Sequence, residues 1–220
     1  MKLWIFGSSM CLPWKLDNPN QGWPALLADH LGITEIHNFS AEAVDNFFIY
    51  QSVLKRLTEI TPDDFLIVGW SHPNRKTFVL DRDNPKHLAA LKTSLHYVDG
   101  GTEIMRSNLP TPDSISKFNF LKPIESGLEF YDTWFKHYFN EYEQRINFQA
   151  FYDSVRLRAP CLYIPIHFTK ESLTDIETLN TICYVDFVNQ HQVQLSDNDY
   201  HLNVFGHKLF AQQLLQFTKK

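Results

Sequence analysis

The two ends of the chain each hold residues that could form one half of a nucleophilic active site. Near the start, Gly7-Ser8-Ser9 follows a short apolar run, and near the finish, Asp199-Tyr200-His201 precedes a segment of helical periodicity. A serine hydroxyl is a weak nucleophile at neutral pH, so it needs a neighbouring base, and the base needs a third group to fix its tautomer. Ser9, His201 and Asp199 supply these three groups if the fold brings the two ends together.

The flanking elements are suited to bringing them together. Residues 3–6 read as a buried strand, and Gly7 breaks that strand into a turn that lifts a serine hydroxyl out at the strand's carboxyl end. In open α/β sheets this edge is where ligands bind. Residues 204–217 have the periodicity of an amphipathic helix that can dock on the sheet, so the polar turn before it would deliver His201 to Ser9.

Buried strands alternate with helical stretches along the rest of the chain, which is the pattern of a parallel sheet with crossover helices. We therefore predict an α/β three-layer sandwich, with a central and mostly parallel five-stranded sheet flanked by helices. The predicted strands are 3–6, 35–37, 65–68, 161–165 and 183–187. The predicted helices are 23–31, 44–57, 85–97, 127–151, 173–180 and 203–217.

Length and composition favour one domain. A chain of 220 residues, 44% hydrophobic and 20% charged, can bury one sizeable α/β core, so we predict a single domain over 1–220. Turn signals interrupt the range 77–127, among them Asp81-Arg82-Asp83-Asn84-Pro85, Gly100-Gly101 and Pro110-Thr111-Pro112. This range is predicted to be an insertion over the carboxyl edge of the sheet, where it could act as a substrate lid.

The order of these parts resembles the SGNH hydrolase family, also called GDSL esterases. Phe6-Gly7-Ser8-Ser9 is similar to the family's first block, with Ser8 where the family usually has Asp, and this similarity puts Ser9 at the nucleophile. Trp23-Pro24 with the helical residues 25–32 resembles the entry helix, and Asn38-Phe39-Ser40-Ala41 resembles the end of the second-block strand. The resemblance implies that the predicted sandwich is the SGNH, flavodoxin-like fold.

The last block resembles a variant of the family in which the acid precedes the histidine by two residues. The commoner spacing is three, and Asn198 occupies that position here. The resemblance therefore implies Asp199 as the residue that orients His201, with Asp197 as its substitute.

The resemblance also implies where an oxyanion would bind, and here the sequence departs from the family. The backbone amide of Ser9 is one implied donor, and Ala43 lies nearest the place of a second-block glycine whose amide is another. The third block normally reads Gly-x-Asn-Asp, whereas this chain has Gly69-Trp70-Ser71-His72-Pro73-Asn74-Arg75. Three alternatives follow: the Ser71 hydroxyl takes the donor role, Asn74 reaches back from a rearranged turn, or the oxyanion hole is incomplete.

Other polar residues indicate substrate contacts rather than a metal. His72 is a candidate substrate contact, and Arg75 could bind a carboxylate or a sulfate on a substrate, although an arginine there can also be a solvated surface residue. The ten histidines show no tight metal-ligand spacing and the three cysteines form no Cys-x-x-Cys pair. We expect no metal site and no cofactor.

Composition limits the classes of partner. The formal net charge of −5 and the lack of a basic stripe with interleaved aromatics argue against a nucleic-acid partner. No segment is long enough for a membrane span, and the apolar stretch at the start lacks a small-residue cleavage site. The odd number of cysteines suits a reducing compartment. We expect a cytoplasmic protein that contacts neither nucleic acid nor membrane and takes a small-molecule or glycan ester as its substrate.

Aromatic residues make up 15% of the chain and are dense before residue 143. Spacings of three and four from Phe130 to Tyr142 predict a helix face packed on the core. The alternative is a platform for sugar rings or an aryl group, or the self-association face of a homo-oligomer.

The resemblance implies a serine esterase or acyl-esterase that cleaves a small or carbohydrate-linked ester, such as an acetyl ester, through an acyl-enzyme. Two alternatives stay open: a binding protein that kept the SGNH scaffold without catalytic competence, and an acyltransferase that uses the same triad. Ordinary local roles also account for single residues. A Gly-Ser-Ser sequence can simply end a strand, and Asp199 can lie in a turn before a helix whose N-cap is Asn203.

Overall fold

The computed structural model describes residues 1–42, 44–72, 76–79, 96–99, 102–107, 137, 140–159, 161–168, 181–196 and 199–218. Its centre is a five-stranded parallel sheet in the order β2-β1-β3-β7-β8. This is the flavodoxin-like strand order, and it confirms the predicted fold class. The strands are β1 (Leu3–Gly7), β2 (Ile36–Asn38), β3 (Phe65–Trp70), β7 (Leu162–His167) and β8 (Ile182–Cys183).

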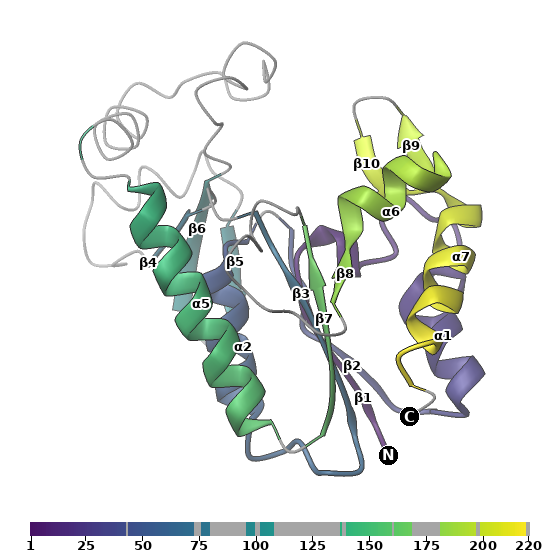
Figure 1. The fold of residues 1–220 in the computed structure, drawn as a ribbon, viewed down its shortest axis with the longest axis horizontal. Coiled ribbons are helices and arrows are strands. Elements are labelled where there is room, and N and C mark those ends of the chain that lie inside the picture. Colours follow the sequence, from purple (N-terminus) through teal and green to yellow (C-terminus); the bar gives the residue numbers. More distant parts are fainter. Residues whose placement is uncertain are drawn as a thin grey trace.

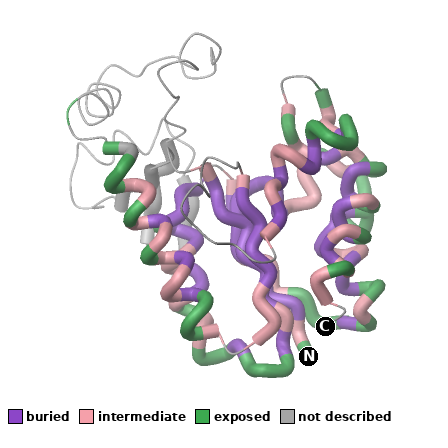
Figure 2. Tube along the Cα trace, viewed as in Figure 1, coloured by how far each residue is buried: buried purple, intermediate pink, exposed green. Residues whose placement is uncertain are grey.

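Helices cover both faces of this sheet and make the three layers (Figure 1). On one face lie α1 (Trp23–Leu31) and α7 (Val204–Leu215), and on the other lie α2 (Asn46–Arg56) and α5 (Glu141–Arg158). The helix α6 (Tyr184–His191) follows β8 directly. Figure 2 shows the buried residues gathered along the inner strands of the sheet, whereas exposed residues lie on the helices and at the turns. No helix in the part of the chain that the structure describes is long and apolar enough to cross a membrane.

The side chains of β1 point alternately to the two faces of the sheet, and this explains why residues 3–6 are all apolar. Leu3 and Ile5 belong to the core under α1 and α7, whereas Trp4 and Phe6 belong to the core under α2 and α5. Successive side chains of a strand point to opposite faces, and a parallel strand with helices on both faces must bury both sets. The continuous apolar run of residues 3–6 is therefore the sequence mark of a central strand, as predicted.

Two smaller antiparallel sheets accompany the central one. One is the pair β9 (Gln194–Ser196) and β10 (Asp199–Leu202), and the other has the order β4-β6-β5, from β4 (Lys76–Val79), β5 (His96–Asp99) and β6 (Thr102–Ser107). The second sheet falls in or next to the predicted insertion 77–127. Most of that range lies outside the described residues, so its role as a lid stays a prediction. Two short 3-10 helices, η1 (Ser9–Cys11) and η2 (Pro19–Gln21), follow β1.

One predicted strand is wrong. The strand expected at 183–187 ends at Cys183, and the chain continues as α6 from Tyr184. The buried residues of this helix are Tyr184, Phe187 and Val188, a spacing of three and four that fits one helix face. The run is short enough that its apolar character alone does not separate a strand from a helix.

The predicted helices match the structure to different degrees. The helix at 23–31 coincides with α1, and those at 44–57 and 203–217 correspond to α2 and α7. The helix predicted at 127–151 is described only from Glu141, after the N-cap Asn140, and continues to Arg158. The end of the helix predicted at 85–97 is instead in strand β5, and the remainder, like 173–180, lies outside the described residues.

The carboxyl ends of β1 and β3 approach each other around one sulfur atom. Gly7 pairs with Gly69 in the strand register, and the Sγ of buried Cys11 packs over both. A Cβ added at Gly69 would lie 2.2 Å from this sulfur, and one added at Gly7 would lie 2.5 Å from it. The two glycines therefore make the space that lets η1 sit directly on the sheet edge.

This packing predicts a non-additive pair of substitutions. Gly69→Ala should lower the free energy of unfolding by about 2 kcal/mol because its methyl group overlaps the sulfur. In a Cys11→Ala background the penalty should fall to less than half, because the next nearest atoms to the new Cβ are at ordinary contact distances of 3.7 and 3.8 Å. Urea unfolding of the wild type, both single variants and the double variant measures this coupling. An equal penalty in both backgrounds would contradict the packing argument.

Candidate active site

Ser9 lies where β1 leaves the sheet. The strand ends at Gly7, Ser8 is buried, and Ser9 is the first residue of η1. The backbone N–H of Cys11 donates to the Ser8 carbonyl at 3.0 Å, and that of Leu12 donates to the Ser9 carbonyl at 3.1 Å. The first N–H groups of a helix have no acceptor inside it. The turn thus presents both the hydroxyl and the backbone N–H of Ser9 at the ligand-binding edge.

His201 reaches this edge on strand β10. Its segment was predicted to be a polar turn, and that is wrong: Asp199 pairs with Ser196 and Leu202 with Gln194 across a short, irregular antiparallel ladder. The ladder leads directly into α7. There, the side chain of Asn203 accepts from the Gly206 N–H at 2.8 Å, which confirms the predicted N-cap.

Three side chains from these two segments form one chain of hydrogen bonds. The Nε2 of His201 lies 2.9 Å from the Ser9 Oγ, and its Nδ1 lies 2.5 Å from the Asp199 Oδ1. The His201 backbone N–H also donates to the Asp199 Oδ1, at 3.1 Å. An ionised carboxylate can only accept, so Nδ1 carries the proton and Nε2 of the neutral ring is left to accept from the serine hydroxyl. The other predicted acid, Asp197, lies outside the described residues.

Asp199 is held in its ionised form. Burial by itself raises the pKa of this carboxyl, but hydrogen bonds from the His201 ring, the Lys15 ammonium and the His201 backbone outweigh burial, so the net pKa lies below its usual value. An anionic Asp199 keeps the proton on Nδ1 and favours a positive charge on the ring.

Two residues that the sequence analysis missed contact this group. The Lys15 Nζ lies 3.0 Å from the Asp199 Oδ2, and the indole of Trp14 stacks on the His201 ring with 4.8 Å between ring centroids and 19° between planes. No sequence pattern marks either residue, because their contacts are with segments more than 180 positions away.

The backbone just after β3 is fixed by two hydrogen bonds with the Asn46 side chain, a residue that no sequence pattern marked. The Ser71 N–H donates to the Asn46 Oδ1 at 2.7 Å, and the Asn46 Nδ2 donates to the Ser71 carbonyl at 3.1 Å. Asn46 is the first residue of α2, behind its N-cap Asp45. The predicted oxyanion donor Ser71 thus lies at the carboxyl edge with its backbone clamped.

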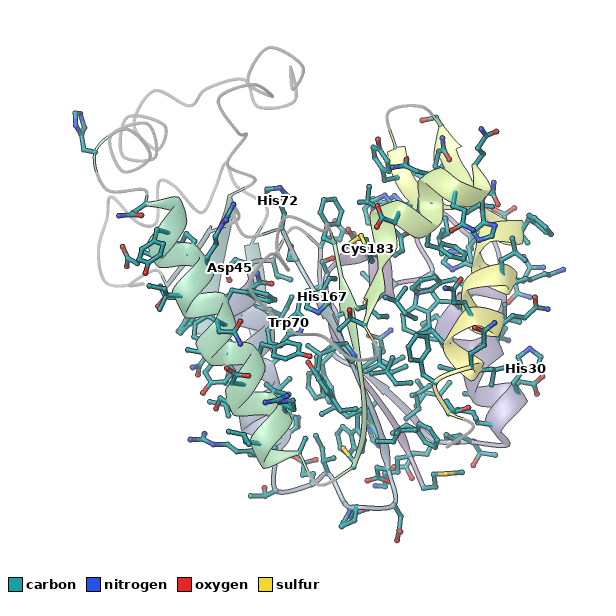
Figure 3. The ribbon with its side chains drawn as sticks, viewed as in Figure 1. His30, Asp45, Trp70, His72, His167 and Cys183 are labelled. Carbon is teal, nitrogen blue, oxygen red and sulfur yellow. The ribbon has the colours of Figure 1, made fainter. Side chains whose placement is uncertain are left out.

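The other residues predicted to bind substrate are only partly described. His72 follows Ser71, and its ring meets Phe168 edge-on at 5.7 Å. Figure 3 shows His72 near the same end of the sheet as Asp45 and His167. Ala43, Asn74 and Arg75 lie outside the described residues, so the composition of the oxyanion hole stays a prediction. Of the aromatic face predicted at 130–142, only Tyr142 has a described side chain, and it is exposed.

The Asn46 clamp predicts a stability effect. Asn46→Ala leaves a buried N–H and a buried carbonyl of Ser71 without these bonds, and should lower the free energy of unfolding by about 2 kcal/mol. Asn46→Asp keeps an acceptor for the Ser71 N–H but places a second acceptor against the Ser71 carbonyl in a buried site, so it should also lower the free energy of unfolding. Urea unfolding measures both, with the exposed Asn20→Ala as the control. An Asn46→Ala variant as stable as wild type would show that the clamp contributes nothing.

Two buried histidines lie near the site without being part of it. His167, at the end of β7, has no hydrogen-bond partner for either ring nitrogen among the described residues, and burial lowers its pKa to about 3. His207, on α7, accepts from the Trp23 N–H at 3.1 Å through Nδ1, and its pKa is lowered to about 4, mainly by burial and also by the charge of His201. Both are neutral near pH 7.

These histidines predict destabilisation in acid. Between pH 6.5 and about 4 the unfolded chain protonates both rings and the folded chain protonates neither, so stability falls as the pH falls, by up to about 1.4 kcal/mol per pH unit for each histidine. His167→Phe removes one contribution without losing a described hydrogen bond. The free energy of unfolding of His167→Phe minus that of wild type should be about 2 kcal/mol larger at pH 4.5 than at pH 7, as measured by urea unfolding. The same difference at both pH values would contradict this account.

The described ranges hold no group of three or more His, Cys, Asp and Glu side chains arranged to bind a metal ion. The chemistry that the described geometry offers is thus that of a hydroxyl hydrogen-bonded to an imidazole, which is in turn oriented by a carboxylate.

Comparison with known proteins identifies the fold. The sequence matches no protein-family model and no curated protein. The structure is similar to TesA, with a TM-score of 0.55, 10% identity, and 100% of this chain and 98% of that chain covered. It is also similar to the psychrotrophic esterase EstA from Pseudoalteromonas sp., in a structure inhibited by monoethylphosphonate, with a TM-score of 0.52, 10% identity, and 99% and 96% covered.

A member of the lipolytic protein G-D-S-L family from Veillonella parvula DSM 2008 also aligns over 100% of both chains, with 11% identity and a TM-score of 0.48. At such identities the likeness to TesA and EstA establishes a shared fold. The resemblance to SGNH hydrolases predicted from the sequence is confirmed at the level of the fold.

Proposed function

We propose that this chain is a carboxylic ester hydrolase of the SGNH type, with Ser9 as nucleophile, His201 as general base and Asp199 as the acid that orients the base. The observation that carries the proposal is the continuous hydrogen-bonded chain, 2.9 Å from Ser9 Oγ to His201 Nε2 and 2.5 Å from His201 Nδ1 to Asp199 Oδ1. The shared fold supports the same reaction class, since EstA is described as an esterase inhibited by a phosphonate.

Acylation would begin with attack of the Ser9 Oγ on the ester carbonyl carbon while His201 Nε2 takes the hydroxyl proton. The carbon–oxygen bond to the alcohol then breaks, and His201 returns the proton to the departing alkoxide. Asp199 keeps the ring oriented and stabilises its positive charge throughout. The products of this half-reaction are an acyl ester on Ser9 and the free alcohol.

Deacylation would repeat the cycle with water. His201 removes a proton from a water molecule as that water attacks the acyl carbon, and then returns the proton to the Ser9 Oγ as the acyl bond breaks. The carboxylic acid leaves and the triad is restored. An acyltransferase would differ only in using another alcohol or amine in place of water.

The oxyanion formed in both steps needs hydrogen-bond donors. The backbone N–H of Ser9, at the start of η1, is the proposed first donor. The Ala43 amide and a side chain from Ser71 or Asn74 are the proposed others. Removing one such donor typically costs about 3 kcal/mol of transition-state stabilisation. The rate therefore depends on whether Ser71 or Asn74 replaces the donor that the family's third-block asparagine supplies. A small acyl ester, free or linked to a carbohydrate, is the proposed substrate.

The proposal predicts covalent labelling by a fluorophosphonate. Wild-type protein should react, because the phosphorus centre traps an activated serine, and mass spectrometry should place the label on Ser9. Ser9→Ala should show no labelling, and His201→Ala should react at least about 100-fold more slowly. Ser8→Ala is the matched control: its hydroxyl is buried and has no described partner, so labelling should persist.

The outcome also separates the alternatives. A folded wild-type protein that does not react would overturn the hydrolase proposal and favour a binding protein on the SGNH scaffold. Labelled protein that turns over p-nitrophenyl acetate into free acetate supports the hydrolase. Transfer of the acetyl group to an added sugar alcohol, faster than release of acetate, would show an acyltransferase.

A further inference from the structure

The segment after η1 contains a turn with an unusual residue in it. The Leu16 N–H bonds to the Pro13 carbonyl at 3.4 Å, which makes Trp14 and Lys15 the central residues of a four-residue turn. Lys15 has φ of +54°, in the left-handed region. Turns with positive φ at this position favour glycine or asparagine, so a lysine here has a conformational cost. Such strain persists where the surrounding structure or the function requires the side chain.

The side chain of Lys15 contacts the acid of the acid–base pair formed by Asp199 and His201. Its Nζ lies 3.0 Å from the Asp199 Oδ2, while Oδ1 receives both bonds from His201. The two carboxylate oxygens therefore have different partners on opposite sides, which fixes the rotation of the carboxylate about its Cβ–Cγ bond. Trp14, the preceding residue, stacks on the His201 ring. Two consecutive residues thus contact both members of the pair.

Other titratable groups that face the acid–base pair are neutral near pH 7. Burial lowers the pKa of His207, on α7, to about 4, and raises the pKa of Cys11, in η1, to about 12. Burial likewise raises the pKa of Tyr184, on α6. Lys15, by contrast, places a positive charge 3.0 Å from the Asp199 Oδ2. Its charge opposes a second positive charge on the imidazole.

We infer that Lys15 is a positioning residue: its ammonium fixes the rotation of the Asp199 carboxylate that presents Oδ1 to His201, and its positive charge lies beside the acid–base pair. Its catalytic consequence rests on the proposed function, because only a neutral His201 can accept the Ser9 proton. The positioning itself does not, because the contact between Lys15 and Asp199 is a property of the folded protein whether or not the serine reacts.

The first experiment compares Lys15→Met with wild type by the pH dependence of the second-order rate of fluorophosphonate labelling, at low ionic strength. Removing the cation should move the acid limb of the profile to higher pH by about half a unit, a small shift because the Lys15 side chain is largely exposed and solvent screens its charge. Lys15→Arg restores the charge and should restore the wild-type limb. Lys208→Met removes an exposed lysine of α7 and controls for net charge, with no shift expected.

The second experiment follows the His201 ring protons by NMR titration, with His201→Ala used to assign the signals. The midpoint should rise in Lys15→Met by the same half unit. Lys15→Gly separates this effect from stability: it relieves the positive φ, so its melting temperature should not fall, yet its midpoint should rise as in Lys15→Met.

These readouts distinguish failure of the inference from failure of the proposed function. A wild type that labels, with the same acid limb and the same His201 midpoint in Lys15→Met, would overturn the role of Lys15 and leave the hydrolase proposal standing. A wild type that does not label overturns the hydrolase proposal, and the NMR titration still decides the role of Lys15. A shift in Lys208→Met equal to that in Lys15→Met would also overturn the inference, because net charge alone would then explain it.

Discussion

The close approach of β1 and β3 at their carboxyl ends is the constraint on which the rest of the site depends. Gly7 and Gly69 leave room for the Cys11 sulfur, and Cys11 lies only two residues after Ser9. The Asn38 side chain, at the end of β2, donates to the Cys11 carbonyl at 2.8 Å. Three adjacent strands thus hold one turn, and the height of the serine above the sheet is set by the packing of the Cys11 sulfur on the two glycines and by the Asn38 hydrogen bond.

His201 reaches the same edge by a different route, through helix packing. The first N–H of α1 donates to the His207 ring, on α7, and this contact connects the helix that follows Ser9 to the helix that follows His201. The Asn203 cap and the bond from its N–H to the Val193 carbonyl then fix where β10 must end. A histidine on a short, irregular hairpin can therefore meet a serine on a rigid sheet edge at hydrogen-bond distance.

Local sequence signals predicted those parts of the molecule whose structure is decided locally. The apolar run 3–6 and the Pro-initiated helix 23–31 were predicted, and the order of serine and histidine placed Ser9 and His201 at one edge. The helix α6 was mistaken for a strand because a short apolar run fits both periods. Lys15, Trp14 and the Asn46 clamp could not be predicted, because each depends on a contact between segments whose relative placement only the fold decides. The oxyanion donors involve residues outside the described part of the chain.

Because 192 positions separate the two partners of the Ser9–His201 hydrogen bond, the ribosome makes them at different times. Ribosomes add about 5 to 20 residues per second, so His201 is made roughly 10 to 40 s after Ser9. Throughout that interval the serine is an ordinary alcohol, and α1 lacks the acceptor for its first N–H. Under the proposed function, the nascent chain carries no activated hydroxyl until His201 has been made and has reached Ser9. Reactivity begins only when the segment 199–215 docks.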